Sequence, residues 1–379
     1  MDINELRNKI DKVDNQLTDL FKERMEISSQ IAEYKRENKL PVKDTERERQ
    51  LLYRISERAE DMGNYAKILF TTIMDLSRSY QNKKLIGNSP LCEKIHNALE
   101  NTEKLFPSKA RVACQGIEGA YSQKACDKIF ALSDIMYVST FENVFQAVES
   151  GLCEYGIVPL ENSTAGSVNQ TYDLLSKHDF YIVKSLRMQI NHVLLTQKGT
   201  NLSNIKEIYS HEQAINQCSS FLRSLKGVKV TVCENTAIAA KMVALSGRDD
   251  VAAISSSDCA EQYGLEIKKD KIQDTDSNFT KFICISKKLE IYPGSNRTSI
   301  VFSTAHKPGA LYNVMSRISA LGINIIKLES RPIVGKDFEF LFYFDLESSV
   351  YSKEFEQLMF ELENQVEGFR YFGSYLEMH

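Results

Sequence analysis

Residues 111–122 read Arg-Val-Ala-Cys-Gln-Gly-Ile-Glu-Gly-Ala-Tyr-Ser: an apolar run, a turn with two glycines, and the start of a helical pattern. Short runs rich in β-branched residues follow along the chain, and helical patterns lie between most of them. This alternation predicts α/β units with parallel sheets, which bind ligands beyond their strand ends, near helix N-termini. The predicted strands are 111–114, 135–139, 156–159, 181–195, 205–210, 228–233, 251–255 and 279–285.

The N-terminal third predicts helices. Its first helix has an apolar seam at alternating steps of three and four, the pattern of a long packed helix: Ile3, Leu6, Ile10, Val13, Leu17, Leu20, Ile27, Ile31 and Tyr34. The seam position between Leu20 and Ile27 is occupied by Arg24. Thr45-Glu46-Arg47-Glu48 is typical of a capping box and predicts a second helix. A third helix carries Phe70, Ile73 and Met74 on its apolar face.

From about residue 291 the pattern is strand, helix, strand, strand, helix, strand, which is typical of a ferredoxin-like α+β fold. We therefore divide the chain into a helical domain at 1–87, a linker helix at 88–109, an α/β domain at 110–288 and an α+β domain at 289–379.

Composition excludes several classes of protein. The chain has 379 residues, 42% of them hydrophobic and 26% charged, with a net charge of −4. This is an ordinary globular balance without a basic stripe, so we expect no nucleic-acid partner. No apolar run approaches the ~20 residues needed to span a bilayer. The first residues lack the pattern of a secretory signal, so we expect a cytoplasmic protein without a membrane partner.

Cysteine and histidine spacing argues against a metal or disulfide scaffold. The eight cysteines are scattered without a CxxC pair, and none of the six histidines is paired at ligand spacing. We expect free buried thiols and no metal or other cofactor.

Polar residues occur where the helical patterns call for apolar ones. Taken by itself, Arg24 could be explained by a side chain that reaches past the edge of the helix to solvent, or by a structural ion pair. Lys35, however, lies 35 − 24 = 11 residues later, within ~20° of the same helix face. Inward polar groups are costly unless they bind something, so the set predicts a site for a small anion: Arg24, Lys35, Glu48, Ser77 and Gln81.

Arg7 supplies a geometric constraint if it belongs to that site. It lies 24 − 7 = 17 residues before Arg24, or ~26 Å along a continuous helix. Both cannot hold one small molecule from the same chain. The spacing permits a dimer in which each subunit lends Arg7 to its partner's site.

In the α/β domain, four turns rich in hydroxyl and amide groups follow predicted strands. Each alone is explained by a tight turn or a helix cap, but four together predict a cleft that binds carboxylates. They are Gln115-Gly116-Ile117-Glu118-Gly119-Ala120-Tyr121-Ser122, 158–168 with Glu161-Asn162-Ser163, Ser210-His211-Glu212-Gln213, and Asp276-Ser277-Asn278-Phe279-Thr280-Lys281.

The helical segment resembles the all-helical chorismate mutase family through Leu6-Arg7-Asn8-Lys9-Ile10-Asp11, Glu23-Arg24, Lys35 and Asp44-Thr45-Glu46-Arg47-Glu48-Arg49. That family forms helical dimers and rearranges chorismate by conformational restraint and positive charge, without a nucleophile. The resemblance implies that the substrate carboxylates are bound by Arg24, Lys35 and Arg47, together with Arg7 from the other chain. It implies that Glu48 and Gln81 contact the ether oxygen and hydroxyl region of the substrate. Asp44 and Ser77 would complete the set of residues around it.

The four turns resemble, in order, those of prephenate dehydratases, whose α/β domain has two lobes like a periplasmic binding protein. The resemblance implies that Thr280 helps to protonate the departing hydroxyl of prephenate. It implies substrate positioning by Ser122, Glu161, Asn162, Ser163, Asn278 and Lys281. His211 is either a proton donor or a structural histidine at a strand end. The family has Arg at position 281, so Lys281 keeps the charge but loses the bidentate fork.

The last segment resembles the ACT regulatory domain joined to prephenate dehydratases. Its motifs are Lys307-Pro308-Gly309-Ala310-Leu311 and Glu329-Ser330-Arg331-Pro332. The resemblance implies a phenylalanine site at a dimer interface, formed by Gly309, Ala310, Leu311, Glu329, Ser330, Arg331 and Pro332, with helix-start amides meeting the carboxylate.

The three motif sets follow the order of the fused chorismate mutase–prephenate dehydratase family. They imply conversion of chorismate to prephenate and then to phenylpyruvate, inhibition by L-phenylalanine, and a homodimer that can pair into a tetramer. Two alternatives stay open: a non-catalytic amino-acid sensor, and an enzyme whose dehydratase has decayed at Lys281.

Overall fold

The computed structural model describes residues 2–38, 44–82, 89–333, 335 and 339–379. The boundary expected at 87/88 lies outside these residues. The chain divides into two compact units: Met1–His96 with Ile300–Arg370, and Asn97–Ser299 with Tyr371–His379. No helix in the described ranges is long and apolar enough to cross a membrane.

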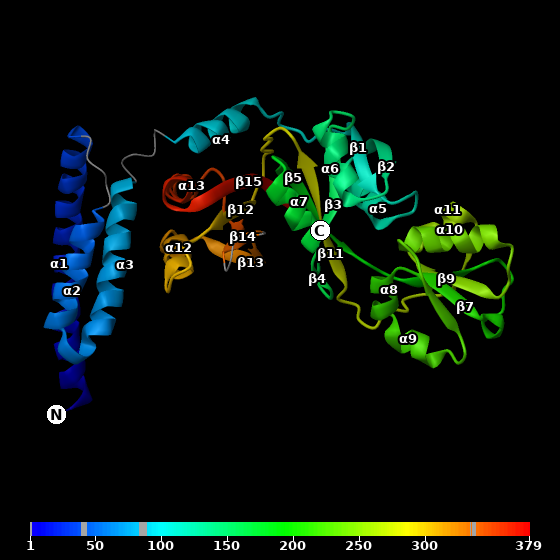
Figure 1. Ribbon diagram of the computed structural model, residues 1–379, viewed down its shortest axis with the longest axis horizontal. Coiled ribbons are helices and arrows are strands. Elements are labelled where there is room, and N and C mark those ends of the chain that lie inside the picture. Colours follow the sequence, from blue (N-terminus) through cyan, green and yellow to red (C-terminus); the bar gives the residue numbers. More distant parts are fainter. Residues whose placement is uncertain (1, 39–43, 83–88, 334, 336–338) are drawn as a thin grey trace. The chain divides into compact units, whose positions relative to one another are not determined.

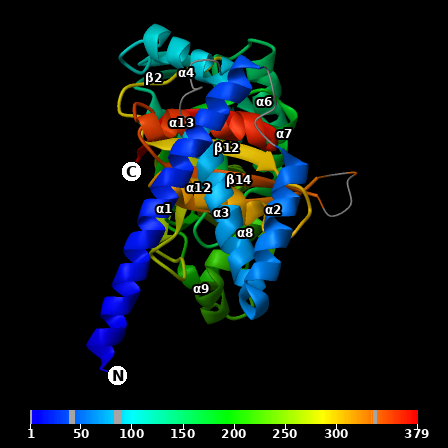
Figure 2. The same cartoon turned by 90° about the vertical axis from the view of Figure 1, so that its left-hand side faces the viewer.

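The N-terminal part of the first unit is all-helical, as predicted. It consists of α1 (Ile3–Glu37), α2 (Thr45–Arg58), a 3-10 turn (Glu60–Met62) and α3 (Gly63–Asn82). Helix α3 packs against both α1 and α2 (Figure 2). The N-cap of α2 is Asp44 rather than Thr45, because the Asp44 side chain accepts the Arg47 backbone N–H at 3.1 Å.

The apolar seam of α1 is exposed in the single chain, although the sequence predicts a packed one. Its nine residues keep between 42% and 62% of their surface accessible, and they follow the helix from Ile3 to Tyr34. A row of apolar side chains on one long helix is typical of a surface that packs against another helix.

The C-terminal part of the chain has the predicted ferredoxin-like order; most of it belongs to the first unit, whereas the start of β12 up to Ser299 and the end of β15 from Tyr371 belong to the second. Its elements are β12 (Arg297–Ser303), α12 (Ala310–Ala320), β13 (Asn324–Pro332), β14 (Phe340–Glu347), α13 (Lys353–Gln365) and β15 (Glu367–Met378). The strand order is β13-β14-β12-β15, and Phe302, Phe344 and Phe355 lie fully buried in its core.

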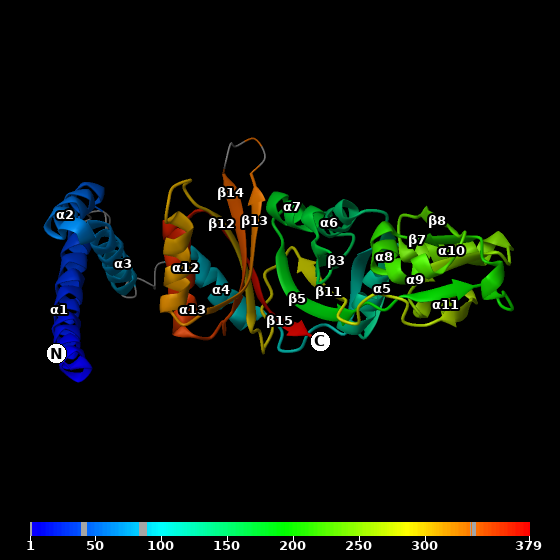
Figure 3. The same ribbon diagram turned by 90° about the horizontal axis from the view of Figure 1, so that it is seen from below.

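The second unit has two α/β lobes (Figures 1 and 3). The first lobe contains β1 (Lys109–Gln115), β2 (Leu132–Val138), β3 (Tyr155–Asn162), β4 (Gly166–Ser167), β5 (Tyr181–Gln189) and β11 (Phe279–Ser286), with α5 (Tyr121–Ile129), α6 (Phe141–Glu149) and α7 (Asn169–Lys177). The second contains β6 (Val193–Thr196), β7 (Glu207–Ser210), β8 (Lys229–Val232), β9 (Val251–Ser255) and β10 (Glu266–Lys269), with α8 (Glu212–Gln217), α9 (Ser219–Ser224), α10 (Thr236–Ser246) and α11 (Asp258–Tyr263). Helix α4 (Pro90–Asn101) lies within the predicted linker.

Both sheets are mixed, which corrects the expectation of parallel sheets. In the first lobe β1 runs parallel to β2 and β3, but β11 is antiparallel to β3 and β5. In the second lobe β7 runs parallel to β8 and β9, but β6 is antiparallel to β9. The antiparallel strands β5, β6 and β11 adjoin the two segments through which the chain leaves the first lobe and returns to it.

The predicted strand 181–195 is two strands in the structure, β5 and β6. The break falls at Ile190–His192, where Asn191 and His192 interrupt the apolar run. This segment is one of the two crossings between the lobes, and the polar pair marks the point where the chain leaves the first lobe.

Candidate functional site

A cleft of about 300 Å³ lies between the two lobes of the second unit. Four of the residues that line it stand in the first turns of helices: Tyr121 in α5, Phe141 in α6, Gln213 in α8 and Thr236 in α10. Two of these helices follow the parallel strands β1 and β2 of the first lobe, and two follow β7 and β8 of the second, so in each lobe the helix N-termini lie at the same edge of the sheet, as is usual in α/β sheets. No Lys or Arg lies among the described residues that line the cleft. An anion in it would therefore be held by helix N-termini, which favour negative charge, and not near the carboxylate of Glu234, which also lines the cleft.

Four of the predicted residues line this cleft: Ser122, Asn162, His211 and Thr280. Asn162 is buried, and backbone N–H groups of Thr164 and Ala165 donate to its Oδ1 at 3.0 and 2.9 Å. Its Nδ2 therefore faces Thr280, and donates to Thr280 Oγ1 at 2.9 Å. No residue in the described ranges accepts the Thr280 hydroxyl hydrogen, so that hydrogen is available to a ligand.

A chain of side-chain amides supports Thr280 from behind. Asn162 Nδ2 also donates to Asn278 Oδ1 at 2.8 Å, and Asn278 Nδ2 donates to Gln217 Oε1 at 3.0 Å. Gln217 Nε2 donates to Thr164 Oγ1 at 2.8 Å. Because each amide has one orientation consistent with its partners, the network fixes where Asn162 and Thr280 point.

Two histidines line the cleft, and burial lowers the pKa of each below its ordinary value. His192 was not predicted; the polar break inside the expected strand 181–195 is the signal that could have found it. His211 is the N-cap of α8, where its Nδ1 accepts the Gln213 N–H at 3.3 Å. The neutral His211 ring therefore carries its proton on Nε2.

The structure places four other predicted residues outside the cleft lining. Ser163 holds the ends of β3 and β11 together, since its Oγ donates to Ser277 O at 2.6 Å and accepts from Phe279 N at 2.9 Å. Asn278 lies one layer behind the cleft, in the amide chain. Glu161 and Lys281 are cross-strand neighbours in the β3–β11 ladder, and neither lines the cleft.

A second pocket, of about 130 Å³, lies in the helical part of the first unit. It brings together all the residues predicted for the mutase site except Arg7: Arg24, Lys35, Asp44, Arg47, Glu48, Ser77 and Gln81. Ser28, Leu51, Met74 and Arg78 also line it and were not predicted. Ser28 stands four residues after Arg24 on α1, so helical spacing alone could have found it.

The cations and donors of this pocket hold one another in place. Arg24 Nη1 donates to Ser77 Oγ at 2.5 Å, and burial lowers the pKa of Arg24. Gln81 Nε2 donates to Ser28 O at 2.9 Å and to Ser28 Oγ at 2.5 Å. Arg78 forms ion pairs with Glu48 and Asp75. The pocket thus combines cations, the amide donor of Gln81 and two carboxylates, Asp44 and Glu48, a set suited to an anion with ether and hydroxyl oxygens.

Arg7 lies near the start of α1 with an exposed side chain, and it is not among the pocket residues. In the ferredoxin-like part, Gly309 is the N-cap of α12 with a φ of +81°, a conformation that favours glycine. Ala310 and Leu311 open that helix, and Glu329, Ser330, Arg331 and Pro332 close β13.

Comparison with known proteins places both sites in named families. Residues 6–82 match the family model for chorismate mutase type II, and residues 112–290 match that for prephenate dehydratase. The bifunctional chorismate mutase/prephenate dehydratase of Escherichia coli strain K12 is 30% identical over 381 residues, covering 98% of this chain and 95% of the relative.

Two further similarities cover the dehydratase part. Arogenate dehydratase/prephenate dehydratase 2 of Arabidopsis thaliana is 36% identical over 311 residues, covering 79% of this chain and 81% of the relative. The crystal structure of prephenate dehydratase in complex with L-Phe from Arthrobacter aurescens is 25% identical, with a TM-score of 0.65, and covers 70% of this chain and 89% of that one. With both domain families present in one chain, and a relative of the same arrangement aligned along almost its whole length, the protein belongs to the bifunctional chorismate mutase/prephenate dehydratases.

Proposed function

We propose that this enzyme supplies phenylpyruvate for phenylalanine biosynthesis in the cytoplasm, and that L-phenylalanine inhibits it through the ACT domain. The observation that carries the proposal is that one chain holds a cationic helical pocket, a two-lobed cleft and a ferredoxin-like domain. A sensor without catalysis does not fit a chain whose two domains belong to enzyme families.

The helical pocket suits rearrangement of chorismate. Arg24, Lys35 and Arg47 provide positive charge for its two carboxylates. Gln81 and Glu48 take the ether oxygen and hydroxyl region. A Claisen rearrangement needs a compact conformer and stabilisation of charge at the ether oxygen, and a preorganised set of donors supplies both.

In the cleft, prephenate loses its ring carboxylate as CO₂ and its hydroxyl as water, and the ring becomes aromatic. We assign Thr280 to the departing hydroxyl, because Asn162 donates to Thr280 Oγ1 and leaves the threonine hydrogen for the substrate. An alcohol is a weak acid, so Thr280 acts by hydrogen bonding or together with His211. Helix N-termini take the carboxylates.

Inhibition is assigned to the start of α12 and the end of β13. The amides that follow Gly309 suit an amino-acid carboxylate, and Glu329–Pro332 complete the site at an interface between subunits. The Arthrobacter aurescens structure, a prephenate dehydratase in complex with L-Phe, supports the choice of L-phenylalanine as the ligand.

We further propose that the enzyme is a homodimer in which Arg7 enters the partner's mutase pocket, and that two dimers can pair into a tetramer. The exposed seam of α1 supports the dimer, because a second copy would cover it. Arg7 is too far along α1 to reach the pocket of its own chain.

Mixing two inactive variants tests the shared site. Arg7→Ala and Arg24→Ala subunits, unfolded and refolded together, form heterodimers with one intact mutase site if Arg7 acts across the interface. About a quarter of the wild-type activity is then expected. If Arg7 acts within its own chain, every site lacks one arginine and the mixture stays inactive.

The function itself is tested by supplying chorismate to the purified protein without metal or nucleotide, and by measuring phenylpyruvate with and without L-phenylalanine. Production that L-phenylalanine suppresses is expected. Prephenate that accumulates would mean an impaired dehydratase. Production that L-phenylalanine leaves unchanged would overturn the regulatory proposal alone.

A further inference from the structure

Lys281 points to the opposite face of β11 from the dehydratase cleft. Its neighbours Thr280 and Phe282 both line the cleft, whereas Lys281 does not. Successive side chains of a strand alternate between its two faces, so this placement follows from the strand itself. A lysine on the far face cannot touch a substrate that Thr280 contacts.

The C-terminal strand binds Lys281 on that far face. Lys281 Nζ lies 3.3 Å from Glu377 Oε2 and 3.5 Å from the Tyr375 hydroxyl, both on β15. The Lys281 and Glu377 side chains are only 12% and 14% exposed. An ion pair with so little solvent contact is screened much less than a surface pair.

Glu377 and Tyr375 are themselves anchored. Arg297 Nε lies 3.8 Å from Glu377 Oε1, and Ser185 Oγ lies 3.5 Å from Oε2. The Tyr375 hydroxyl lies 2.7 Å from Ser299 Oγ. The end of β15 also pairs in parallel with β5, the strand next to β11. Lys281 therefore meets a fixed partner.

The β3–β11 ladder shows why a fixed partner matters at this position. Thr280 pairs with Asn162 and Lys281 with Glu161, but the register shifts between Lys281 and Phe282. An irregularity of this kind interrupts the regular hydrogen bonds of a ladder and bends the strand. On its other edge β11 keeps a regular register with β5 from Phe279 to Cys284, so the contacts of the Lys281 side chain reinforce the strand where the β3 ladder is irregular.

We propose that Lys281 is a positioning residue of the dehydratase: its ion pair with Glu377 of the C-terminal strand holds β11 so that the Thr280 hydroxyl stays aimed into the cleft. This role differs from the substrate contact that the resemblance implies for position 281. It also makes the last residues of the chain a determinant of a reaction that they do not touch.

The test compares Lys281→Met, Lys281→Arg and Glu377→Gln in the full-length protein, with prephenate as substrate. A displacement of about 1 Å can cost up to ~10²-fold in rate, so we expect kcat about tenfold lower in Lys281→Met and Glu377→Gln. We expect KM for prephenate to stay within about twofold of wild type, because substrate binding is not involved. Lys281→Arg should restore most of kcat. The double variant Lys281→Met/Glu377→Gln should have a kcat no lower than that of the less active single variant, because both changes break the same ion pair.

The matched control is the ion pair of Lys287 with Glu149, which are 3.1 Å apart and each 42% exposed. Lys287→Met and Glu149→Gln should leave kcat unchanged. Mutase activity in the same preparation reports correct folding separately from the dehydratase. Should Lys281→Met fail to fold, Glu377→Gln decides the question alone.

A contact between Lys281 and the substrate would produce a different pattern: KM rises about tenfold or more in Lys281→Met, and Glu377→Gln matches wild type. That result overturns the proposal. Wild-type kcat in both variants also overturns it, because the ion pair would then be without effect on Thr280.

Discussion

His192 Nε2 lies 2.9 Å from Gln217 Oε1, inside the cleft between the two lobes. The same oxygen accepts Asn278 Nδ2 at 3.0 Å, so His192 must be the donor and carries its proton on Nε2. His192 thereby extends the amide chain that ends at Thr280. A residue of the crossing segment is thus tied to the group that we assign to the departing hydroxyl.

Replacement of His192 tests this link. His192→Leu removes the donor to Gln217, and we expect dehydratase kcat to fall about tenfold as the amide chain loosens. His192→Gln keeps a donor at a similar reach and should retain more activity. Phenylpyruvate formation from prephenate is the measurement, and His96→Gln, an exposed histidine on α4, is the control. Equal activity of the Leu and Gln variants would contradict a role for the donor.

The burial of His192 in the cleft also makes the stability of the folded protein depend on pH. Because burial lowers the pKa of His192 in the folded state, the unfolded chain binds the proton more tightly. Stability is therefore complete above the ordinary histidine pKa of ~6.5, and is lost as pH falls below it toward the folded-state pKa. Tm measured from pH 8 to pH 5 should decline less in His192→Gln than in wild type. Burial also lowers the pKa of His211, so some decline should remain in the variant.

Thr280→Val removes the hydroxyl from the cleft with little change in side-chain shape. We expect phenylpyruvate formation to fall ~10²- to 10⁴-fold, the range that a positioned proton donor contributes. Mutase activity should stay unchanged. Thr275→Val removes an exposed hydroxyl five residues earlier and serves as the control. Wild-type turnover in Thr280→Val would assign the departing hydroxyl to another donor.

Arg24→Met removes a half-buried cation from the helical pocket. We expect mutase activity to drop ~10²-fold or more, since one electrostatic contact to a transition state has that effect. Arg24→Lys should recover only part of it, because lysine lacks the planar fork. Dehydratase activity with prephenate should not change. Arg49→Met, an exposed arginine next to Glu48 on α2, is the control and should keep full mutase activity.

Sequence periodicity predicted those parts of the fold that depend on burial alone. The expected strand 251–255 coincides with β9, because five successive residues there are fully buried. The helical pocket could also be predicted, since it consists of polar residues on apolar helix faces. The sequence predicts a packed seam on α1, but the seam is exposed in the single chain, because periodicity shows that a helix face is apolar and not what covers it.

Other features depend on contacts between residues far apart in the sequence. No local pattern shows that Lys281 faces Glu377, because strand alternation gives the face but not the partner. The split of 181–195 into two strands depends on the second lobe, to which β6 belongs, and in the sequence only the polar pair Asn191–His192 interrupts the apolar run. The sequence did not predict His192 as a site residue for the same reason: its hydrogen-bond partner Gln217 lies 25 residues away and contacts it only in the folded domain.

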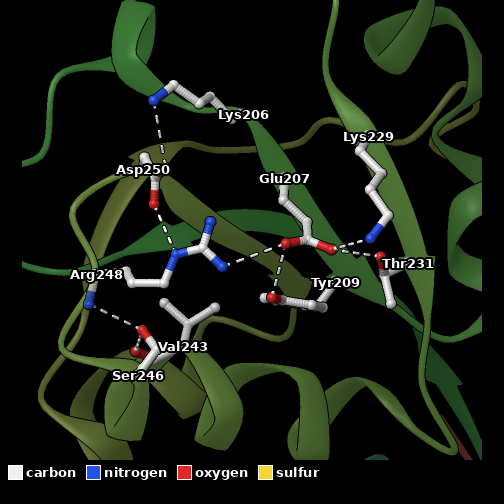
Figure 4. Close-up of polar contacts among 9 residues, drawn as sticks. All are labelled: Lys206, Glu207, Tyr209, Lys229, Thr231, Val243, Ser246, Arg248 and Asp250. Atoms are coloured by element: carbon white, nitrogen blue, oxygen red, sulfur yellow. Dashed lines mark hydrogen bonds and ion pairs between the residues drawn. The ribbon is translucent and has the colours of Figure 1, made fainter.

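Glu207 provides a prediction about the second lobe alone. At the start of β7, its carboxylate accepts from Lys229 Nζ at 2.9 Å, Thr231 Oγ1 at 2.7 Å and the Tyr209 hydroxyl at 3.0 Å, and it pairs with Arg248 at 3.3 Å (Figure 4). These hydrogen bonds, of which the one from Lys229 has the largest effect, lower the pKa of Glu207 from 4.5 to about 2.

The sign of the effect follows from that shift. A carboxylate whose pKa is lowered by folding stabilises the protein above its ordinary pKa, and this stabilisation is lost as pH falls toward the folded-state value. Glu207→Gln should therefore have a lower Tm than wild type at neutral pH, and the difference should shrink between pH 4.5 and about 2. Glu261→Gln, at an exposed position of α11, should have a wild-type Tm throughout. A difference for Glu207→Gln that is constant with pH would show that its contacts stabilise the lobe without depending on the charge.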